Sequence, residues 1–358
     1  TDEAAAVLER VADSGIELGG DQAAALRGIV SSGAQLQTLV APAGSGKSFV
    51  VGQTAAVWAE HGGRVLGLAP SQIAANVLAD EGVPAMNLAA WRGAARRGEA
   101  PPADLLVVDE AGMARTEDLR AVVEHARATG ATVLLVGDPR QLAAVGPGGA
   151  LADVSEHGTR HELTSVRRFS ARWEAKASLQ LRDGDAAAVV AYDKHGRLVD
   201  GGTAEQAETA AGRSWLADTV AGRSSVLLVG SNEAAGRLSG ELRRQLVELG
   251  RVTEHGVPLG RDGNTAGIGD VVQARRNDWT IDARPVNRAT YRVIDLTAEG
   301  GLVVEPTGGG TPRTLPPAYV ADDVALAYAS TVHAAQGRTV DTSHAVLAPG
   351  QAASAAYV

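Results

Sequence analysis

The chain has 358 residues, a formal net charge of −9 and 45% hydrophobic residues, which is typical of globular proteins. That length exceeds one comfortable hydrophobic core, so two or three domains are expected. The sequence contains no cysteine, which excludes disulfides, thiolate catalysis and iron–sulfur clusters. It also lacks both an apolar run of about 18 residues and a secretion signal, so we expect a cytoplasmic protein with no membrane partner.

The first half of the chain alternates short apolar runs with helical stretches. Strands are predicted at residues 37–41, 64–69, 105–109 and 132–137, and helices at residues 47–60, 71–80 and 116–129. Strands that are apolar on both faces and alternate with helices indicate a parallel sheet covered on both sides. The first half therefore predicts an α/β domain.

The second half contains one more such unit and then changes character. A strand is predicted at residues 225–230 and a helix at 232–250. From about residue 251, turns rich in Gly, Pro and Asp separate β-like runs at residues 270–274, 291–296 and 302–305. This pattern predicts a small antiparallel insertion. Residues 324–329 and 343–347 then predict a return to the second parallel sheet.

A phosphate-binding loop is predicted between the first strand and the first helix. Residues 43–48 read Ala-Gly-Ser-Gly-Lys-Ser, and glycines before a helix N-terminus let backbone N–H groups wrap a phosphate chain. Lys47 can reach the β- and γ-phosphates, and the Ser48 hydroxyl can bind Mg²⁺. Ala41 replaces the usual first glycine, which is tolerated if its φ is negative. The expected phosphate-binding residues are Ala43, Gly44, Ser45, Gly46, Lys47 and Ser48. The alternative is a glycine-rich turn with an incidental lysine.

Two carboxylates end the predicted strand at residues 105–109. Asp109 is placed to hold magnesium through water, and Glu110 to orient or deprotonate an attacking water. Alone, such a pair is usually solvated, but it follows the phosphate-binding loop by about 60 residues in the same sheet pattern. The two motifs together favour nucleotide hydrolysis over simple binding.

A polar loop, residues 137–142, follows the next strand with the sequence Gly-Asp-Pro-Arg-Gln-Leu. Ligands of α/β sheets bind in the crevice at the carboxyl ends of the strands. Gln141 is therefore a candidate sensor of the γ-phosphate. The alternative interpretation is a plain Asp-Pro turn.

The combined motifs resemble those of superfamily 1B DNA helicases, the RecD-like enzymes. In chain order they are residues 21–22, 43–48, 69–71, 109–113, 137–142 and 328–337. Residues 167–174 and 337–341 narrow the resemblance to the helicase part of conjugative relaxases of the TraI/TrwC type. The resemblance covers nearly the whole chain.

This resemblance implies an α/β fold of two RecA-like P-loop domains with parallel sheets, ATP bound between them, and a small β-barrel-like insertion in the second. The first domain is expected over residues 1–163, the second over residues 164–250 and 324–358, and the insertion over residues 251–323.

The resemblance also assigns residues. Gln22 resembles the residue that reads adenine, Arg168 the arginine that reaches ATP from the second domain, and Gly337 a residue that approaches the nucleotide. The catalytic residues are then expected to be Lys47, Glu110, Gln141 and Arg168, and the magnesium site Ser48 and Asp109. The residues that match DNA-facing positions are Pro70, Ser71, Thr331, His333 and Gln336.

The function expected from these motifs is an ATP-dependent helicase or translocase that moves 5′→3′ on single-stranded DNA with ATP and Mg²⁺. An alternative is a module that binds single-stranded DNA without turnover. An unrelated P-loop kinase is disfavoured, because it does not explain residues 328–337.

The chain ends differ from the family pattern. The first residue is Thr1, and the sequence stops at Val358, before the family's last motif with its second ATP-facing arginine. We therefore expect a fragment of a longer protein with further domains, such as a relaxase domain. Without the last motif, we expect this piece alone to be inactive. The segment between residues 73 and 105 is short, so any strand-separating hairpin in the first domain is expected to be small.

Two smaller features have competing interpretations. His157 and His161 are four residues apart, but no third ligand is near, so a surface loop is favoured over a metal site. Residues 272–292 hold five arginines against two aspartates, a local net charge of +3. Trp279 and Tyr291 interleave with them, as in a groove for single strands. A solvated surface explains that window equally well.

Overall fold

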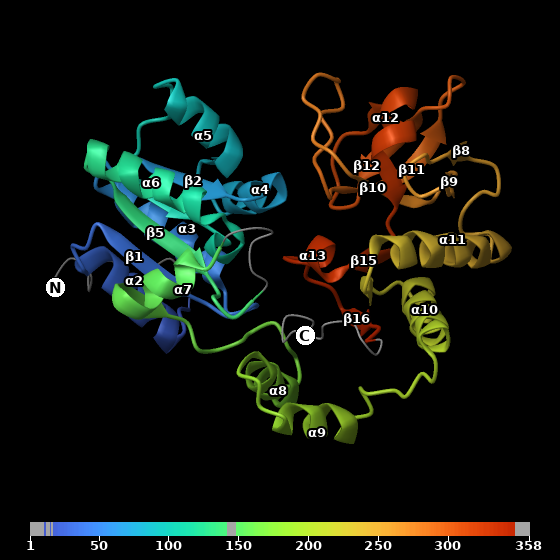
Figure 1. Ribbon diagram of the computed structural model, residues 1–358, viewed down its shortest axis with the longest axis horizontal. Helices are drawn as coiled ribbons and strands as arrows, with labels where there is room; N and C mark the ends of the chain where they lie inside the picture. Colours follow the sequence, from blue (N-terminus) through green and yellow to red (C-terminus); the bar gives the residue numbers. More distant parts are fainter. Residues whose placement is uncertain (1–10, 12–14, 16, 142–147, 348–358) are drawn as a thin grey trace. The chain divides into compact units, whose positions relative to one another are not determined.

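The computed structural model describes residues 11, 15, 17–141 and 148–347 (Figure 1). The chain divides into two compact units, and the division falls between Arg197 and Leu198. Each unit has its own sheet and its own hydrophobic core. The units are described separately below.

The first unit is built on a six-stranded parallel sheet. In spatial order its strands are β3 (Ala85–Asn87), β2 (Val65–Ala69), β4 (Leu105–Val108), β5 (Thr132–Gly137), β1 (Leu36–Val40) and β6 (Thr159–Glu162). The central strands were predicted from their apolar runs. The edge strands β3 and β6 were not, because β3 has only three residues and β6 is polar.

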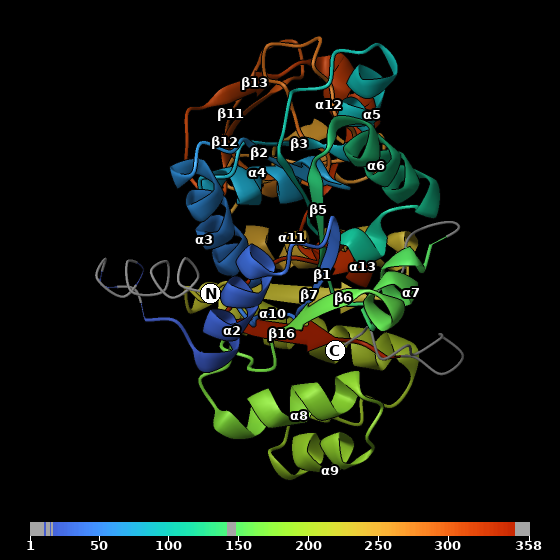
Figure 2. The same cartoon turned by 90° about the vertical axis from the view of Figure 1, so that its left-hand side faces the viewer.

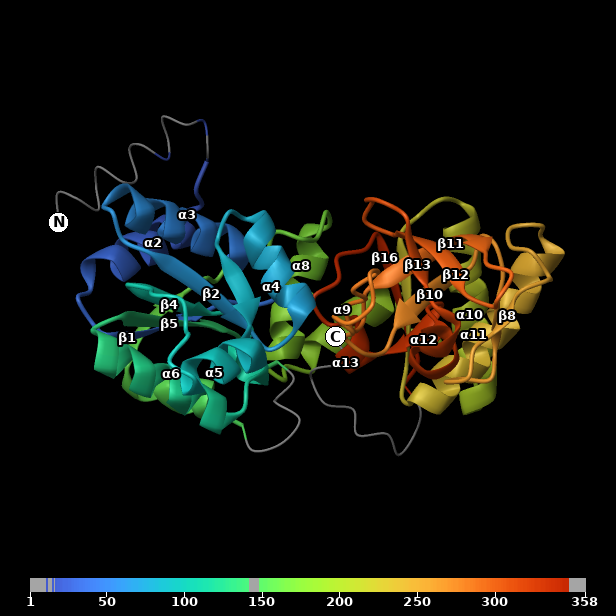
Figure 3. The same ribbon diagram turned by 90° about the horizontal axis from the view of Figure 1, so that it is seen from above.

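Helices cover both faces of this sheet (Figure 3). On one face, Leu105 and Val107 of β4 share a core with α2 (Gly20–Ser31), α3 (Lys47–Glu60) and α4 (Gln72–Asp80). On the other face, Leu106 and Val108 pack with α5 (Leu88–Arg96), α6 (Thr116–Thr129) and α7 (Ala150–His157). Because successive side chains of a strand point to opposite faces, an apolar run must be buried on both sides. The predicted α/β fold with a covered parallel sheet is confirmed.

The first unit continues beyond its sheet into two helices that the sequence placed in the second domain. Helices α8 (Arg172–Arg182) and α9 (Ala187–Lys194) pack together, and Trp173 stacks on His195 with ring centroids 3.8 Å apart. Figure 2 shows the two helices as a pair. The division between the units therefore falls at residue 197 and not at residue 163. The physical reason is a set of contacts between residues 164–182 and the phosphate-binding loop and its neighbours, described below.

The second unit contains a three-stranded parallel sheet and an antiparallel sheet that share one core. The parallel strands are, in order, β15 (Ala329–Thr331), β7 (Ser225–Val229) and β16 (Thr342–Ala345). Helices α10 (Ala204–Val220) and α11 (Asn232–Glu248) pack on them, and the short α13 (Val332–Ala335) follows β15.

The insertion forms a five-stranded antiparallel sheet. Its order is β13 (Arg313–Leu315), β12 (Leu302–Pro306), β11 (Thr290–Leu296), β10 (Val271–Ala274) and β14 (Val324–Leu326), while β8 (Val257–Pro258) and β9 (Thr265–Ala266) form a separate pair and α12 (Pro317–Asp323) precedes β14. The edge strands β13 and β14 do not pair with each other, so the barrel-like closure is not confirmed. Residues 324–326 pair with β10, so they belong to the insertion and not, as predicted, to the parallel sheet.

Candidate functional site

The phosphate-binding loop joins β1 to α3, as predicted. Gly44 and Gly46 have φ angles of 77° and 85°, in the left-handed region that favours glycine. Ser45 is buried, and its hydroxyl donates a hydrogen bond to the Pro42 carbonyl over 2.8 Å. Ala41 is not among the residues with a positive φ, so the condition for an alanine at this position is met.

Lys47, the first residue of α3, lies against the two carboxylates that end β4. Its Nζ donates a hydrogen bond to Glu110 and lies 3.7 Å from Asp109 Oδ1. Burial acts to lower the pKa of Lys47, but attraction to Asp109 and Glu110 outweighs it and the pKa is raised. Burial also raises the pKa of Asp109, and the charge of Glu110 adds to that effect while Lys47 opposes it. Three ionisable groups are thus held together beside the loop.

The backbone at Glu110 is strained. Its φ of 49° and ψ of 38° are left-handed, a conformation that a residue with a side chain adopts at a cost of about 1–3 kcal/mol. The N–H of Glu110 donates to Asp109 Oδ1 over 2.8 Å, and the 3₁₀ turn η1 (Ala111–Met113) follows. This turn fixes the Glu110 carboxylate toward Lys47.

Arg168 lies over the phosphate-binding loop. A Cβ built on Gly44 would fall 2.5 Å from Arg168 Nε and 2.8 Å from Arg168 Cβ. Partial burial lowers the pKa of Arg168, and the charge of Glu110 acts in the opposite direction; an arginine stays cationic in either case. Lys47, Glu110 and Arg168 therefore meet at the loop. All three belong to the first unit, whereas the sequence placed Arg168 in the second domain.

Arg167 anchors this segment to the loop. Its backbone N–H donates to the Gly44 carbonyl over 2.7 Å, and its Nη1 donates to the Ser45 carbonyl over 3.0 Å. Asp21 Oδ1 accepts from Arg167 Nη2 over 2.7 Å. Asp21 also accepts hydrogen bonds from the N–H groups of Thr164 and Ser165. Burial acts to raise the pKa of Asp21, but these hydrogen bonds hold it well below its ordinary value.

Gln22 is buried at the same loop. Its Nε2 donates to the Ser45 carbonyl over 3.3 Å, and its Oε1 accepts from the Gly19 N–H over 3.0 Å. The side chain is thus bonded at both ends within the first unit. Its expected contact with adenine stays a prediction.

The loop after β5 is held by an ion pair with α8. Arg182 donates two hydrogen bonds, of 2.7 and 2.9 Å, to the fully buried carboxylate of Asp138. Gln141 Nε2 donates to Asp138 Oδ2 over 3.3 Å. Arg140 adds an exposed ion pair with Asp183. Leu142, the last residue of the predicted motif, lies outside the described residues.

Pro70 and Ser71 follow β2 in the first unit. Ser71 caps α4 by accepting a hydrogen bond from the Ala74 N–H over 3.1 Å, and the Pro70 carbonyl accepts from Asn87 Nδ2 over 3.2 Å. These bonds are structural, so the expected contact with DNA stays a prediction.

The other predicted DNA-facing residues lie in the second unit. Thr331 ends β15, and His333 lies exposed on α13, where its carbonyl accepts a hydrogen bond from Arg288. Gln336 Oε1 is buried without a hydrogen-bond partner in the described part of the chain. Gly337 is exposed, with a φ of 84°.

A magnesium ion fits the donor set at the loop. Within the described ranges, the Ser48 hydroxyl makes no hydrogen bond, so it is available as a ligand. Asp109 supplies a buried carboxylate, and hydroxyl and carboxylate oxygens are donors that Mg²⁺ prefers. No cluster of three His, Asp or Glu side chains that could hold a metal occurs in the described part of the chain.

His157 and His161 do not share a helix. His157 ends α7, whereas His161 lies on β6 and contacts Gln37 Oε1 over 2.8 Å.

The two aromatic residues of the arginine-rich window, residues 272–292, differ in exposure. Tyr291 is 3% exposed and belongs to the core, while Trp279 is 54% exposed, so only Trp279 is available for stacking.

Sequence reasoning missed the parts played by Arg167, Arg182 and Asp138 at this site. Asp138 lay inside a motif that was recognised, but Arg182 lies 44 residues further along in a helix with no motif. Only the arrangement of the chain in space brings them together.

The fold and the loop define an α/β P-loop protein, and comparisons with known proteins give its family. A family model described as an AAA domain matches residues 17–203, a little more than half of the chain. The chain belongs to this AAA domain family. Among residues 17–141 and 148–347, no helix has both the length and the apolar character needed to span a bilayer.

Curated relatives come from conjugation systems. The chain is 28% identical over 319 residues to the conjugal transfer protein TraA of Rhizobium radiobacter, which covers 87% of this chain and 29% of that protein. It is 27% identical over 318 residues to a probable conjugal transfer protein TraA of Sinorhizobium fredii, with the same coverage. The chain thus spans less than a third of the length of these relatives.

A solved structure has a similar fold. The crystal structure of Pif1 helicase from Candida albicans matches with a TM-score of 0.58 and 15% sequence identity, and the match covers 96% of this chain and 92% of that one. At this identity the match speaks for the fold alone. The family model and the TraA relatives confirm the expected resemblance to TraI-type conjugative proteins, and the Pif1 structure agrees with the helicase-like fold that this resemblance implies.

Proposed function

We propose that this chain is the motor module of a longer conjugal transfer protein. It would hydrolyse ATP and move 5′→3′ along single-stranded DNA. One observation carries the proposal, namely the meeting of Lys47, Glu110 and Arg168 at the phosphate-binding loop. A loop that only binds nucleotide needs neither a carboxylate held by a strained backbone nor a second cation beside it.

The residues divide the chemistry as follows. Backbone N–H groups of the loop and Lys47 would bind the β- and γ-phosphates. Glu110 would accept a proton from the attacking water or orient it. Arg168 would stabilise the negative charge that develops on the transferred phosphoryl group, an effect worth about 10³–10⁵ in rate when an arginine does this elsewhere.

Ser48 and Asp109 would hold magnesium. When bound, this ion supplies positive charge that neutralises the phosphate oxygens. Lys47 is paired with Glu110 in the structure. Nucleotide phosphates would compete for Lys47 and release the Glu110 carboxylate for its role.

Gln141 would couple the γ-phosphate to the rest of the module. It lies on the loop that Asp138 and Arg182 fix to α8, and α8 and α9 lead directly to the division between the units. Loss of the γ-phosphate would therefore be transmitted toward the second unit along these two helices. Lobe closure on ATP and reopening after hydrolysis would advance the DNA.

The test is ATP turnover with and without a single-stranded oligonucleotide, in the wild type and in Glu110→Gln. We expect stimulation by the oligonucleotide and a loss of about 10²–10⁴ in turnover in the variant. Glu99→Gln, an exposed carboxylate of the same unit, serves as the control. Turnover by Glu110→Gln near the wild-type rate would remove the proposed role. Binding of the oligonucleotide without any turnover, in this chain and in a longer one, would indicate a non-catalytic module.

Direction is tested separately. Forked substrates with a 5′ or a 3′ single-stranded tail report which end the motor enters. Unwinding only from the 3′ tail would contradict the proposed 5′→3′ movement.

A further inference from the structure

Two adjacent arginines, Arg167 and Arg168, lie where the chain passes over the phosphate-binding loop, and they differ in their bonding. Arg167 donates hydrogen bonds from its backbone and its guanidinium to the loop and to Asp21. The Arg168 guanidinium makes no hydrogen bond or ion pair within the described ranges. Arg168 is therefore free to bind a ligand, whereas the donors of Arg167 are largely occupied.

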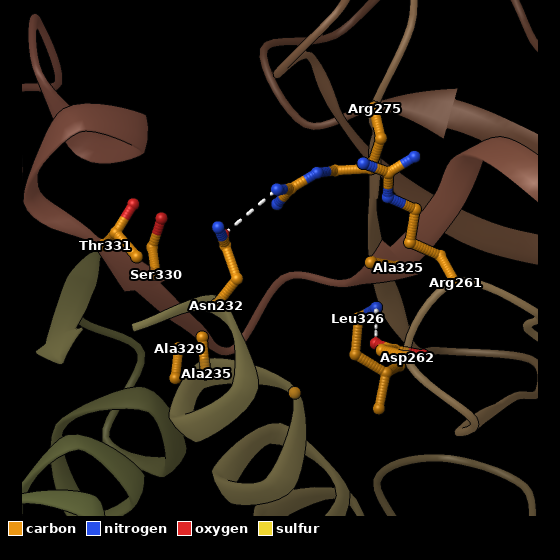
Figure 4. A pocket seen from close by; sticks show the side chains of 11 residues that line it. Asn232, Ala235, Arg261, Asp262, Arg275, Ala325, Leu326, Ala329, Ser330 and Thr331 are labelled. Carbon is orange, nitrogen blue, oxygen red and sulfur yellow. Dashed lines mark hydrogen bonds between the residues drawn. The ribbon is translucent and has the colours of Figure 1, made fainter. Parts of the chain in front are cut away.

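An arginine can be held by bonds of its own side chain or by the backbone that carries it. Arg275, which lines a pocket of the second unit, shows the first case, because its Nη2 donates to Asn232 Oδ1 over 3.1 Å (Figure 4). Arg168 has no such bond among the described residues, so its position over Gly44 depends on the backbone of residues 164–168. Fixing an irregular segment costs conformational entropy, which bonds to that segment must offset.

Asp21 supplies three of the bonds that hold this segment. Its Oδ2 accepts from the N–H groups of Thr164 over 3.0 Å and Ser165 over 2.9 Å, and its Oδ1 accepts from Arg167 Nη2 over 2.7 Å. The Asp21 side chain is only 10% exposed. Hydrogen bonds to an ionised carboxylate are roughly twice as strong as those between neutral groups. One carboxylate thus fixes the segment immediately before Arg168.

The approach of Arg167 to Asp21 also requires a glycine at position 19. A Cβ built on Gly19 would lie 1.9 Å from Arg167 Nη2, whereas a Cβ built on Gly20 meets nothing within 4 Å. The φ of Gly19 is −65°, which any residue adopts, so the requirement is one of space and not of backbone conformation. The space beside Asp21 is therefore reserved for the Arg167 guanidinium.

Resting on the function proposed above, we infer that Asp21 is a positioning residue for ATP hydrolysis, which holds residues 164–168 so that Arg168 lies over the phosphate-binding loop. Asp21 would not touch the nucleotide, because both of its oxygens already accept bonds from this segment and Oδ1 also accepts from the Gln22 N–H. A misplacement of about 1 Å can cost about 10²-fold in rate. The effect of Asp21 should therefore appear in kcat.

The competing explanation is an ion pair that only stabilises the first unit. A chain without Arg168 separates the two explanations, because a residue that acts through Arg168 has nothing left to position there. The first experiment therefore measures ATP turnover of Asp21→Asn in the wild type and in an Arg168→Ala background.

In the wild-type background we expect Asp21→Asn to lower kcat about tenfold, with a change in KM for ATP below about threefold, because a charged acceptor is replaced by a neutral one. In the Arg168→Ala background the same substitution should lower kcat by less than about twofold. Gly19→Ala should reproduce this pattern without any change of charge, because it displaces the Arg167 guanidinium. Gly20→Ala should not.

The matched control is Asp104→Asn. Asp104, in the same unit, also accepts from a backbone N–H and a guanidinium, both of Arg64, over 2.8 and 3.0 Å. It lies directly before β4, at the end of the parallel sheet opposite the phosphate-binding loop. Asp104→Asn should leave kcat and KM unchanged, and melting curves check that every variant is folded.

A second experiment follows the segment itself and does not depend on turnover. The chain contains no cysteine, so Arg168→Cys provides a single attachment point for a nitroxide spin label. We expect an EPR spectrum of restricted motion from this label, and a spectrum of faster motion when Asp21→Asn is added. Adding Asp104→Asn should leave the motion restricted.

The outcomes separate the positioning role from the proposed function. An equal loss of kcat from Asp21→Asn with and without Arg168 would overturn the inference, because Asp21 would then act elsewhere. A spin label at position 168 that is as restricted with Asp21→Asn as with Asp104→Asn would overturn it as well. Faster motion of the label with Asp21→Asn, in a chain that turns over no ATP, would support the positioning role while the proposed motor fails.

Discussion

The Arg182 guanidinium and the Asp138 carboxylate form a bidentate ion pair between α8 and the loop that carries Gln141, with hydrogen bonds of 2.7 and 2.9 Å. The Asp138 side chain is fully buried and Arg182 is 17% exposed. A buried carboxylate needs such a partner, because desolvation disfavours its charged form. The pair therefore fixes both the loop after β5 and helix α8, which follows Arg167 and Arg168 along the chain.

Replacing Arg182 by alanine should leave this carboxylate unpaired. We expect a loss of about 3–5 kcal/mol in the free energy of unfolding, measured by urea denaturation. Arg182→Lys keeps the charge but not the two parallel hydrogen bonds. Its free energy of unfolding should therefore lie between those of the wild type and Arg182→Ala. In turnover assays the lysine variant should lower kcat more than it raises KM for ATP, because Gln141 loses its support. Arg140→Ala breaks only the exposed pair with Asp183, and a cost as large as that of Arg182→Ala would contradict the argument.

Replacing Arg168 by alanine should slow hydrolysis with little effect on nucleotide binding. The expected loss in kcat is about 10³-fold, since the arginine would act on charge that develops during transfer. Single-turnover kinetics and ATP binding by fluorescence measure the two effects separately. Arg120→Ala, on an arginine 75% exposed on α6, should leave both unchanged. If Arg168→Ala weakened ATP binding in proportion to turnover, Arg168 would be a binding residue only.

Alanine at Gly44 should disturb the loop for two reasons that a control can separate. Both Gly44 and Gly62 have a left-handed φ, of 77° and 76°, and alanine there costs about 1–2 kcal/mol. A Cβ at Gly62 meets nothing within 4 Å, whereas one at Gly44 meets the Arg168 side chain. Both variants should therefore lose stability, but only Gly44→Ala should lose ATP binding and turnover. Equal turnover in the two variants would show that Arg168 does not need this close approach.

His161 should make the first unit less stable in mild acid. Burial lowers the pKa of His161 in the folded protein, whereas the pKa of an unfolded histidine is about 6.5. The unfolded state then binds more protons as the pH falls through that value, so stability declines. His161→Gln should reduce this pH dependence in urea melts between about pH 5 and 7.

The control for this pH effect is His157. The pKa of this exposed histidine is raised by hydrogen bonding to the Asp153 carbonyl and by nearby acidic groups, so its contribution has the opposite sign, present in acid and lost as the pH rises. His157→Gln should not reduce the acid destabilisation. A reduction equal to that from His161→Gln would show that burial is not its origin.

The sequence alone determined the local parts of the nucleotide site. The phosphate-binding loop, the carboxylates after β4 and the bounds of α3 and α6 follow from glycine placement, apolar runs and helix start signals, which act over a few residues. Ala41 is an example of such a local feature. Whether alanine can replace glycine there depends only on the φ angle of that one residue, which is not positive.

Only the tertiary structure decided which distant residues meet. It placed Arg168 over Gly44 in the first unit, paired Arg182 with Asp138, and assigned β14 to the antiparallel sheet. It also showed that, of the two aromatic residues in the arginine-rich window at residues 272–292, Tyr291 is buried and Trp279 is exposed. These outcomes depend on contacts between segments far apart along the chain, and charge or hydrophobicity at one position does not specify its partner in space.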